Sequence, residues 1–341
     1  MEDLSSKFLT VIIPTYNHGK FVSAAIESAL IQRTFVLKVI VVDDGSKDGT
    51  REYLLRLYRN NQRVKLVFLT QNQGIYNALI AGMSGLSTKY FAFLAADDVL
   101  LQEWAHVMQR LTEQYPDVGF YHCDSYRLIE DTGEIYAWKL PYKKICDFIQ
   151  PEFALKLIKK NGVCFPSNGV VYNAAHWANE MLFEKAGPIG DKVGLMSLAI
   201  RFGYAYTKER LCLSREISTA MSASLTESSE LKKKIAATAT LHNNQDIKFE
   251  ECTRAIIVRA VYGFLKMKIE AISTSITYML GTNAHRFDRK ITIQIMRVVF
   301  GLSLLVSRVT LLGFRFGYGR IRFRDSTAEE LQRYLSSLRK H

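Results

Sequence analysis

Two adjacent carboxylates, Asp97 and Asp98, are the residues of this chain whose types and spacing point most directly to chemistry. They end an apolar run that begins at Tyr90, and helical sequence follows from Leu101. Such a run is typical of a buried parallel strand, and open α/β sheets bind ligands outside the carboxyl ends of their strands. Carboxylates there need a cation or hydrogen-bond donors, and Mg²⁺ or Mn²⁺ is the cation that oxygen ligands favour. The alternative is a solvated turn in which Asp98 caps the next helix.

Three strand–helix units are expected before this pair. Apolar, β-branched runs predict strands over residues 8–14, 36–42 and 64–69, and amphipathic helical sequence follows each of them. Strands that alternate with helices predict a parallel sheet with right-handed crossovers, so the polar residues that follow the strands should meet at one edge. Those residues are Thr15, Tyr16, Asn17, Asp43 and Asp44. No GxGxxG or GxxxxGK[ST] occurs, so the usual dinucleotide and P-loop fingerprints are absent.

Four segments, in order, resemble the motif series of family 2 glycosyltransferases with the GT-A fold. They are Val11–Asn17, Val41–Thr50, Asn72–Gly74 and Ala96–Asp98. The chain departs from the family where Ile75 follows the third motif instead of an Ala-Arg pair, and where Ala95 replaces the first acid of Asp-x-Asp-Asp. Both acids that the resemblance needs remain.

The resemblance implies an α/β protein: a Rossmann-like, mixed GT-A sheet flanked by helices, followed by a helical C-terminal region. We expect a GT-A domain over residues 1–225, with its donor half over about 1–125 and its acceptor half over about 126–225. Within the acceptor half, the sequence predicts a hairpin over 128–138. Residues 226–341 form the separate basic region.

An inverting, metal-dependent transferase is the function that this resemblance implies. Its donor would be a nucleotide-diphosphate sugar, with UDP favoured, its cofactor Mg²⁺ or Mn²⁺, and its acceptor a saccharide or lipid-linked saccharide in bacterial surface polysaccharide synthesis. By position, Tyr16 would pack on the base, Asp44 would accept a hydrogen bond from it, Asp97 would approach the ribose or the metal shell, and Asp98 would ligate the metal. The other implied donor-binding residues are Pro14, Thr15, Asn17, Asn72, Gly74 and Arg215.

Each of these roles has a structural alternative. Tyr16 would then only cover the sheet edge, Asp43 would cap its turn, and Asn72 and Gly74 would shape a loop. Arg215, which the resemblance places in a closing loop near the diphosphate, would instead form a surface salt bridge.

Inversion also needs a general base that takes the proton of the acceptor hydroxyl. The family often opens a helix in the acceptor half with a Glu-Asp pair, and this chain has Gly190 and Asp191 before the apolar helix expected over 193–202. Asp191 is therefore the expected base. Glu184 is the rival acid, and a helix cap is the structural alternative for Asp191.

The net charge of +12 lies almost entirely in the last third of the chain. Residues 1–225 hold 25 Lys/Arg and 23 Asp/Glu, a net of +2, whereas residues 226–341 hold 20 and 10, a net of +10. Between 286 and 324 nine basic residues stand against one acid, and the longest charge-free run, 298–307, is too short to span a bilayer. This pattern predicts either an interfacial helix on an anionic membrane or a helical subdomain with a basic face.

Composition narrows the remaining choices. Five scattered cysteines without a CxxC pair, and a polar N-terminus unlike a signal peptide, favour a cytoplasmic chain, peripheral on the inner face of the membrane if 286–324 binds lipid. No nucleic-acid-binding module accompanies the charge, so nucleic acid is not an expected partner. A nucleotidyltransferase would carry a basic glycine-rich loop after the first strand, which Pro14–Asn17 is not. The chain could also be a non-catalytic sugar-nucleotide-binding module. Loss of Asp98 or Asp191 would favour that alternative, and both acids are present.

Overall fold

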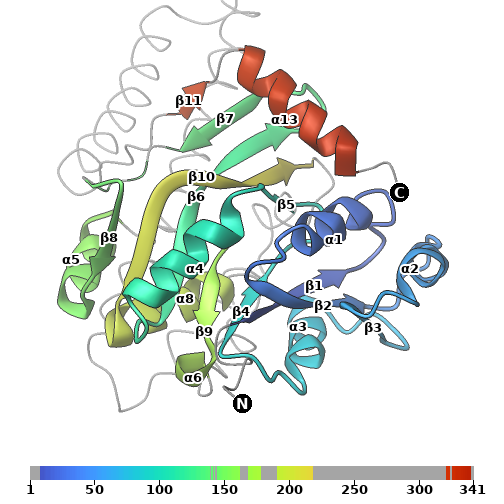
Figure 1. Ribbon diagram of the computed structural model, residues 1–341, viewed down its shortest axis with the longest axis horizontal. Helices are drawn as coiled ribbons and strands as arrows, with labels where there is room; N and C mark the ends of the chain where they lie inside the picture. Colours follow the sequence, from blue (N-terminus) through green and yellow to red (C-terminus); the bar gives the residue numbers. More distant parts are fainter. Residues whose placement is uncertain are drawn as a thin grey trace, which may run out of the picture.

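A mixed β-sheet with helices on both faces forms the centre of the computed structural model (Figure 1). The structure describes residues 8–138, 140, 142, 144–161, 168–177, 190–217, 320–322 and 325–338. The main path of the sheet has the strand order β11-β7-β6-β9-β4-β1-β2-β3, and β10 pairs with β5, β6 and β8 beside it.

The first half of the sheet is parallel, as the alternating pattern predicted. Its elements are β1 (Leu9–Thr15), α1 (Val22–Leu30), β2 (Val36–Asp43), α2 (Thr50–Tyr58), β3 (Val64–Phe68), α3 (Ile75–Met83) and β4 (Tyr90–Phe93). Strand β1 lies between β2 and β4, with Thr15 opposite Asp43 and Ile12 opposite Phe93. The carboxyl ends of β1, β2 and β4 therefore meet at one edge.

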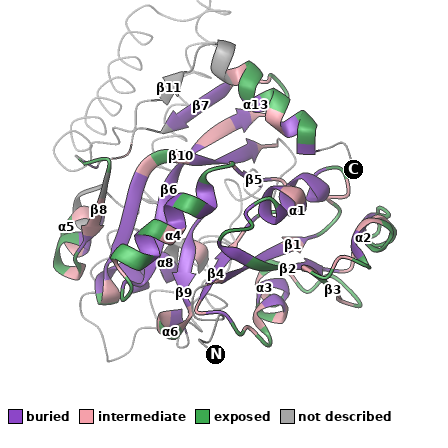
Figure 2. Cartoon of the chain, viewed as in Figure 1, coloured by how far each residue is buried: buried purple, intermediate pink, exposed green. Residues whose placement is uncertain are grey.

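Both faces of this sheet are covered, which explains the nearly continuous apolar runs of its strands. Val11 and Ile13 pack on the side of α1, α2 and α4 (Trp104–Gln114), together with Trp104. Ile12 packs on the opposite side, in the cluster that contains Leu79 of α3. Figure 2 shows the central strands as buried and the outer turns of the covering helices as exposed.

The second half brings the sheet back in mixed orientation. Its elements are β5 (Val99–Leu100), α4, β6 (Phe120–Ile129), β7 (Ile135–Trp138), β8 (Cys146–Ile149), α5 (Pro151–Asn161), β9 (Val171–Asn173), α6 (Ala174–Trp177), α8 (Gly190–Phe202) and β10 (Tyr204–Glu216). Arg127 pairs with Tyr136, so the hairpin predicted over 128–138 is confirmed. Strand β9 joins β4 and β6 antiparallel.

Strand β10 is the main element that the sequence did not predict. It has 13 residues and runs parallel to β6 and antiparallel to β5 and β8. Its register against β6 shifts between Tyr206 and Cys212. The irregularity falls on the charged stretch 208–210 and breaks the period-2 pattern from which a strand is predicted. Arg215 therefore lies in a strand and not in a closing loop.

The last described segments of the chain pack on the sheet and on α1. Strand β11 (Arg320–Arg322) pairs antiparallel with β7, and α13 (Asp325–Leu338) lies beside α1 (Figure 1). Leu331, Leu335 and Leu338 share a buried cluster with Val99 and Leu213. We assigned this segment to a separate basic region, and the structure places residues 320–322 and 325–338 on the sheet instead. Residues 218–319, which hold most of the predicted membrane-binding stretch, lie outside the described residues, as does Glu184. None of the described helices has the length and apolar character needed to cross a bilayer.

This packing predicts that α13 contributes to the stability of the whole fold. Replacing the buried Leu335 with alanine should lower the free energy of unfolding by about 2–5 kcal/mol, because a leucine in a packed cluster leaves a cavity. Replacing the exposed Ser336 should change it by less than about 0.5 kcal/mol. Urea unfolding of both variants measures this difference. Equal values for the two would mean that α13 is not part of the cooperative unit.

Candidate active site

The polar residues that follow β1, β2 and β4 lie together at the carboxyl edge of the sheet. The backbone N–H of Asp44 donates to the carbonyl of Thr15 over 2.9 Å, which continues the β1–β2 ladder past its last strand residues. Strand β4 flanks β1 on its other side and leads directly into Asp97 and Asp98. The convergence expected from the sequence is therefore present in the structure.

The loop after β1 is fastened to the loop after β2. Asn17 has a left-handed φ of +54°, its N–H donates to Ser46 Oγ over 2.9 Å, and its Oδ1 accepts from the N–H of Lys47 over 2.8 Å. Tyr16 is 37% exposed as a residue, so its ring can stack on a planar ligand. The buried hydroxyl of Thr15 has no hydrogen-bond partner among the described residues. Pro14, before it, is half-buried.

Asp44 holds the third loop in place. Its Oδ1 accepts from the N–H of Gln73 over 2.7 Å, and its Oδ2 accepts from the N–H of Gly74 over 2.9 Å. Gly74 has a φ of +89°, a conformation that favours glycine, and its N–H also donates to Asn72 Oδ1. Asn72 and Gly74 thus shape this loop, and each Asp44 oxygen retains a lone pair for a further donor.

Asp43 has the structural role that was its alternative. Its Oδ1 accepts from the N–H of Ser46 over 3.2 Å and so caps the turn. Gly45 within this turn has a φ of +71°, and a Cβ there would lie 2.6 Å from the backbone carbon of Gln71. The close approach of the two loops therefore requires glycine.

The two acids after β4 have different surroundings. Asp98 is 8% exposed as a residue, and its Oδ1 accepts from the backbone N–H of Arg215 over 2.9 Å. Burial, and next the neighbouring charge of Asp97, raise the pKa of Asp98 to about 8. Asp97 is half-buried, and its carboxylate receives no hydrogen bond from any residue that the structure describes. Asp97 is therefore the acid with a free face at this edge.

This difference bears on which acid fits a divalent cation. No group of three or more His, Cys, Asp or Glu side chains gathers in the described residues. Mg²⁺ and Mn²⁺ sites of nucleotide enzymes need only one or two carboxylates, because substrate phosphates supply the other oxygens. The free carboxylate of Asp97 fits such a site. Asp98, to which we assigned the metal, already accepts a backbone hydrogen bond through Oδ1, and its metal role stays a prediction.

Arg215 is buried and already engaged by protein groups. Its Nη1 donates to Glu130 Oε2 over 2.9 Å, its Nε donates to the carbonyl of Asp97 over 2.7 Å, and its Cζ lies 5.3 Å from the centre of the Phe21 ring. With a side chain that is 2% exposed, it forms no surface salt bridge. A contact with the diphosphate stays a prediction. Sequence reasoning missed Glu130 and Phe21, because Glu130 carries only the signal of a hairpin turn.

The expected base, Asp191, lies half-buried in the first turn of α8. Burial, and next the negative charge of Asp191, raise the pKa of Tyr172 on β9. The Tyr172 ring stacks on Phe91 of β4, with 5.1 Å between ring centres. Asp191 is therefore near the strand that pairs with β4, the strand that leads into the acidic turn.

Comparison with known proteins gives a family model that matches part of the chain, and a fold. Residues 10–168 match the family model described as Glycosyl transferase family 2. The chain is 28% identical over 149 residues to an uncharacterised glycosyltransferase of Haemophilus influenzae, an alignment that covers 41% of this chain and 46% of that protein. It is 36% identical over 109 residues to one of a Nostoc species, which covers 31% of this chain and 32% of that protein. The chain thus spans less than half the length of these two curated relatives.

Among solved structures, the chain is similar to S. aureus TarS 1–349, crystallised in complex with UDP-GlcNAc. The TM-score is 0.58, with 15% sequence identity over 79% of this chain and 80% of that one. The expected fold, a GT-A-like mixed sheet flanked by helices, is confirmed.

Proposed function

We propose, from the glycosyl transferase family 2 domain that residues 10–168 form, that this chain moves a sugar from a nucleotide-diphosphate donor to a hydroxyl acceptor. UDP is the favoured nucleotide, and the acceptor is a saccharide or a lipid-linked saccharide, as in bacterial surface polysaccharide synthesis. One observation carries the proposal. Three different groups lie at one edge of the sheet, where β1, β2 and β4 end. They are the exposed Tyr16, the Asp44 carboxylate, which has spare lone pairs, and the Asp97 carboxylate, which has no partner among the described residues.

Each of these three groups matches one part of the donor. Tyr16 offers its ring face to the base, and Asp44 accepts a hydrogen bond from the base edge. Asp97 holds the Mg²⁺ or Mn²⁺ that accompanies the diphosphate, in place of the Asp98 assignment made from the motif alone. When bound, the cation supplies positive charge that stabilises the leaving diphosphate.

The transfer itself is a single displacement. The acceptor oxygen forms a bond to the anomeric carbon as the bond from that carbon to the diphosphate oxygen breaks on the opposite face, so the configuration inverts. Asp191 takes the proton that the acceptor hydroxyl loses. Its place at the start of α8, near the strand beside β4, supports this role.

A thermal-shift screen tests the proposal. UDP-, GDP- and dTDP-sugars are added to the full chain with Mn²⁺ or with EDTA, and the Asp97→Ala variant serves as the control. We expect one nucleotide family to raise the melting temperature in Mn²⁺ and to raise it less in EDTA and in the variant. Nucleoside triphosphates form a parallel arm of the screen, and stabilisation by these alone would favour a nucleotidyltransferase. If a nucleotide sugar binds but a separate assay finds no release of nucleoside diphosphate, a non-catalytic module is favoured.

The basic stretch 286–324, most of which lies outside the described residues, is proposed to hold the enzyme on the inner face of the cytoplasmic membrane, where lipid-linked acceptors are presented. Replacing Arg297, Arg308 and Arg315 with glutamine should weaken co-sedimentation with phosphatidylglycerol vesicles, since each basic residue near an anionic surface contributes about 1 kcal/mol. Deletion of the whole region is unsuitable, because α13 packs on the sheet. The proposal would be contradicted if the wild-type chain did not bind the vesicles at low salt, or if its binding did not weaken as salt rises.

A further inference from the structure

We propose that Arg215 and Glu130 are positioning residues that hold the turn of Asp97 and Asp98 so that the Asp97 carboxylate faces the metal and diphosphate of the donor. The inference rests on the proposed function and gives it two residues that the motif series does not assign to this task. It adds a positioning task to the contact with the diphosphate that the motif series predicts for Arg215, whose Nη2 has no hydrogen-bond partner among the described residues.

Arg215 binds both members of the acidic turn, Asp97 and Asp98. The backbone N–H of Arg215 donates to Asp98 Oδ1 over 2.9 Å, and its Nε donates to the carbonyl of Asp97 over 2.7 Å. The turn therefore has its first peptide carbonyl and its second side chain fixed from the same point on β10. The Asp97 carboxylate, the group needed for the ligand, receives no hydrogen bond from the described residues.

Strand β10, which carries Arg215, pairs with the segment that follows the acidic turn. Val99 pairs with Leu213, and Leu100 pairs with Cys212, so two backbone pairs bring Arg215 into register with Asp98. On the far side of this ladder, Tyr334 of α13 donates to the carbonyl of Leu100 over 2.8 Å. The chain after the acidic turn is thus held by two elements remote in sequence.

Glu130 balances the charge of the buried Arg215 guanidinium. A cation whose side chain is 2% exposed is costly unless it is paired, and Glu130 Oε2 pairs with Nη1 over 2.9 Å. Glu130 is itself in place because its N–H donates to the carbonyl of Glu216, next to Arg215 on β10. This pairing balances the charge of the guanidinium beside the acidic turn. Without Glu130, the buried cation would lose this charge partner, and the position of Arg215 beside the turn would be less well defined.

The Arg215 side chain also reaches the loop after β1, which is proposed to hold the base. The Arg215 guanidinium lies over the Phe21 ring, at 5.3 Å, and the N–H of Phe21 donates to the carbonyl of His18 in the loop after β1. Arg215 therefore contacts the loop proposed to hold the base, the turn proposed to hold the metal, and the β6–β7 hairpin. One buried residue sets the spacing of the two donor-binding segments.

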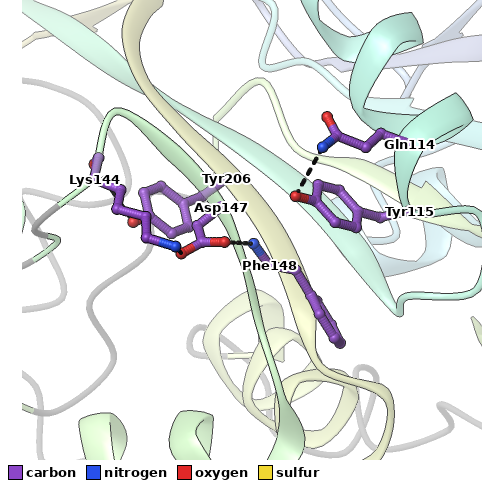
Figure 3. Close-up of polar contacts among 6 residues, drawn as sticks. All are labelled: Gln114, Tyr115, Lys144, Asp147, Phe148 and Tyr206. Carbon is purple, nitrogen blue, oxygen red and sulfur yellow. Dashed lines mark hydrogen bonds and ion pairs between the residues drawn. The ribbon is translucent and has the colours of Figure 1, made fainter.

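The test compares Glu130→Gln, Arg215→Lys and the double variant with the wild type. The matched control is Lys144→Ala, which breaks the exposed ion pair of 2.7 Å between Lys144 and Asp147 at the β8 edge (Figure 3). Mn²⁺ affinity is measured by the paramagnetic resonance of free Mn²⁺ in the presence of saturating UDP. Thermal unfolding without metal reports on the fold, and steady-state kinetics separate kcat from KM.

Residues that orient a metal ligand typically change metal affinity or activity by about 10- to 100-fold when they are replaced. We expect Glu130→Gln and Arg215→Lys each to weaken Mn²⁺ binding by about tenfold or more. Because the two residues act as a unit, the double variant should bind Mn²⁺ about as tightly as the single variant with the lower Mn²⁺ affinity. Lys144→Ala should match the wild type. Folded Glu130→Gln protein with wild-type Mn²⁺ affinity would overturn the inference, even if Arg215→Lys fails to fold. A wild-type chain that binds no Mn²⁺ with UDP would instead remove the proposed function on which the inference rests.

Discussion

Sugar transfer is expected to fall by at least about a hundredfold when Asp97 is replaced with alanine, the scale for loss of one strong electrostatic element in a transition state. The reason is that Asp97 alone presents a carboxylate without hydrogen bonds from the described residues at the carboxyl edge of β4. Excess EDTA should inhibit the wild type to a similar extent. Release of the nucleoside diphosphate from the donor is the measurement.

The matched control for this variant is Asp98→Asn. An asparagine at this position keeps an oxygen that can accept the N–H of Arg215, so the turn should retain its shape. We expect this variant to keep substantially more activity than Asp97→Ala. The reverse order, with Asp98→Asn inactive and Asp97→Ala active, would return the metal to Asp98. Full activity of Asp97→Ala in EDTA would remove the metal from the mechanism.

The second large effect is expected for Asp191→Asn. Asparagine keeps the size of the side chain and an acceptor oxygen, but it cannot take a proton at neutral pH. Transfer should fall by about 10²- to 10⁴-fold, the usual contribution of a general base. Donor affinity, measured separately by calorimetry, should stay within a few-fold of the wild type, because the base acts on the acceptor.

A parallel substitution at Glu184, the rival acid, serves as the control for Asp191. Glu184→Gln should leave transfer close to the wild-type rate. If donor binding and transfer decline together in Asp191→Asn, Asp191 is a structural cap of α8. If Glu184→Gln alone collapses transfer, the base is Glu184.

The parallel half of the fold was predictable because its signals are local. Each strand over 9–15, 36–43 and 64–68 is an apolar run that ends in turn residues, and each helix after it has a regular apolar face. Their order implies the parallel sheet, and the parallel sheet implies that Tyr16, Asp44 and Asp97 converge. Local pattern and topology together were sufficient for this part.

The parts that could not be predicted depend on contacts between distant segments. Strand β10 carries charged residues at its irregularity, so its alternation is broken where it bends past β6. The pairing of Arg215 with Glu130 joins residues 85 apart, and nothing in either neighbourhood announces it. Likewise, the apolar face of α13 is visible in the sequence, whereas its partners Val99 and Leu213 are not.

The same limit applies to the choice between the two neighbouring acids. Asp97 and Asp98 are equivalent in the sequence, and the motif alone assigned the metal to Asp98. Burial under β10 and the N–H of Arg215 distinguish them, and both are tertiary features. The position of the site was therefore predictable, while the different surroundings of its two acids were not.

Calorimetric titration of the full chain with UDP, GDP and dTDP, in Mn²⁺ and in EDTA, tests the central claim most directly, because it needs no knowledge of sugar or acceptor. We expect one of these nucleotides, with UDP favoured, to bind at one site per chain in Mn²⁺. Binding should be at least about tenfold weaker in EDTA and in Asp97→Ala, since both leave the diphosphate charge uncompensated. Absence of binding by all three nucleotides, or equal binding with and without Mn²⁺, would contradict the proposed function.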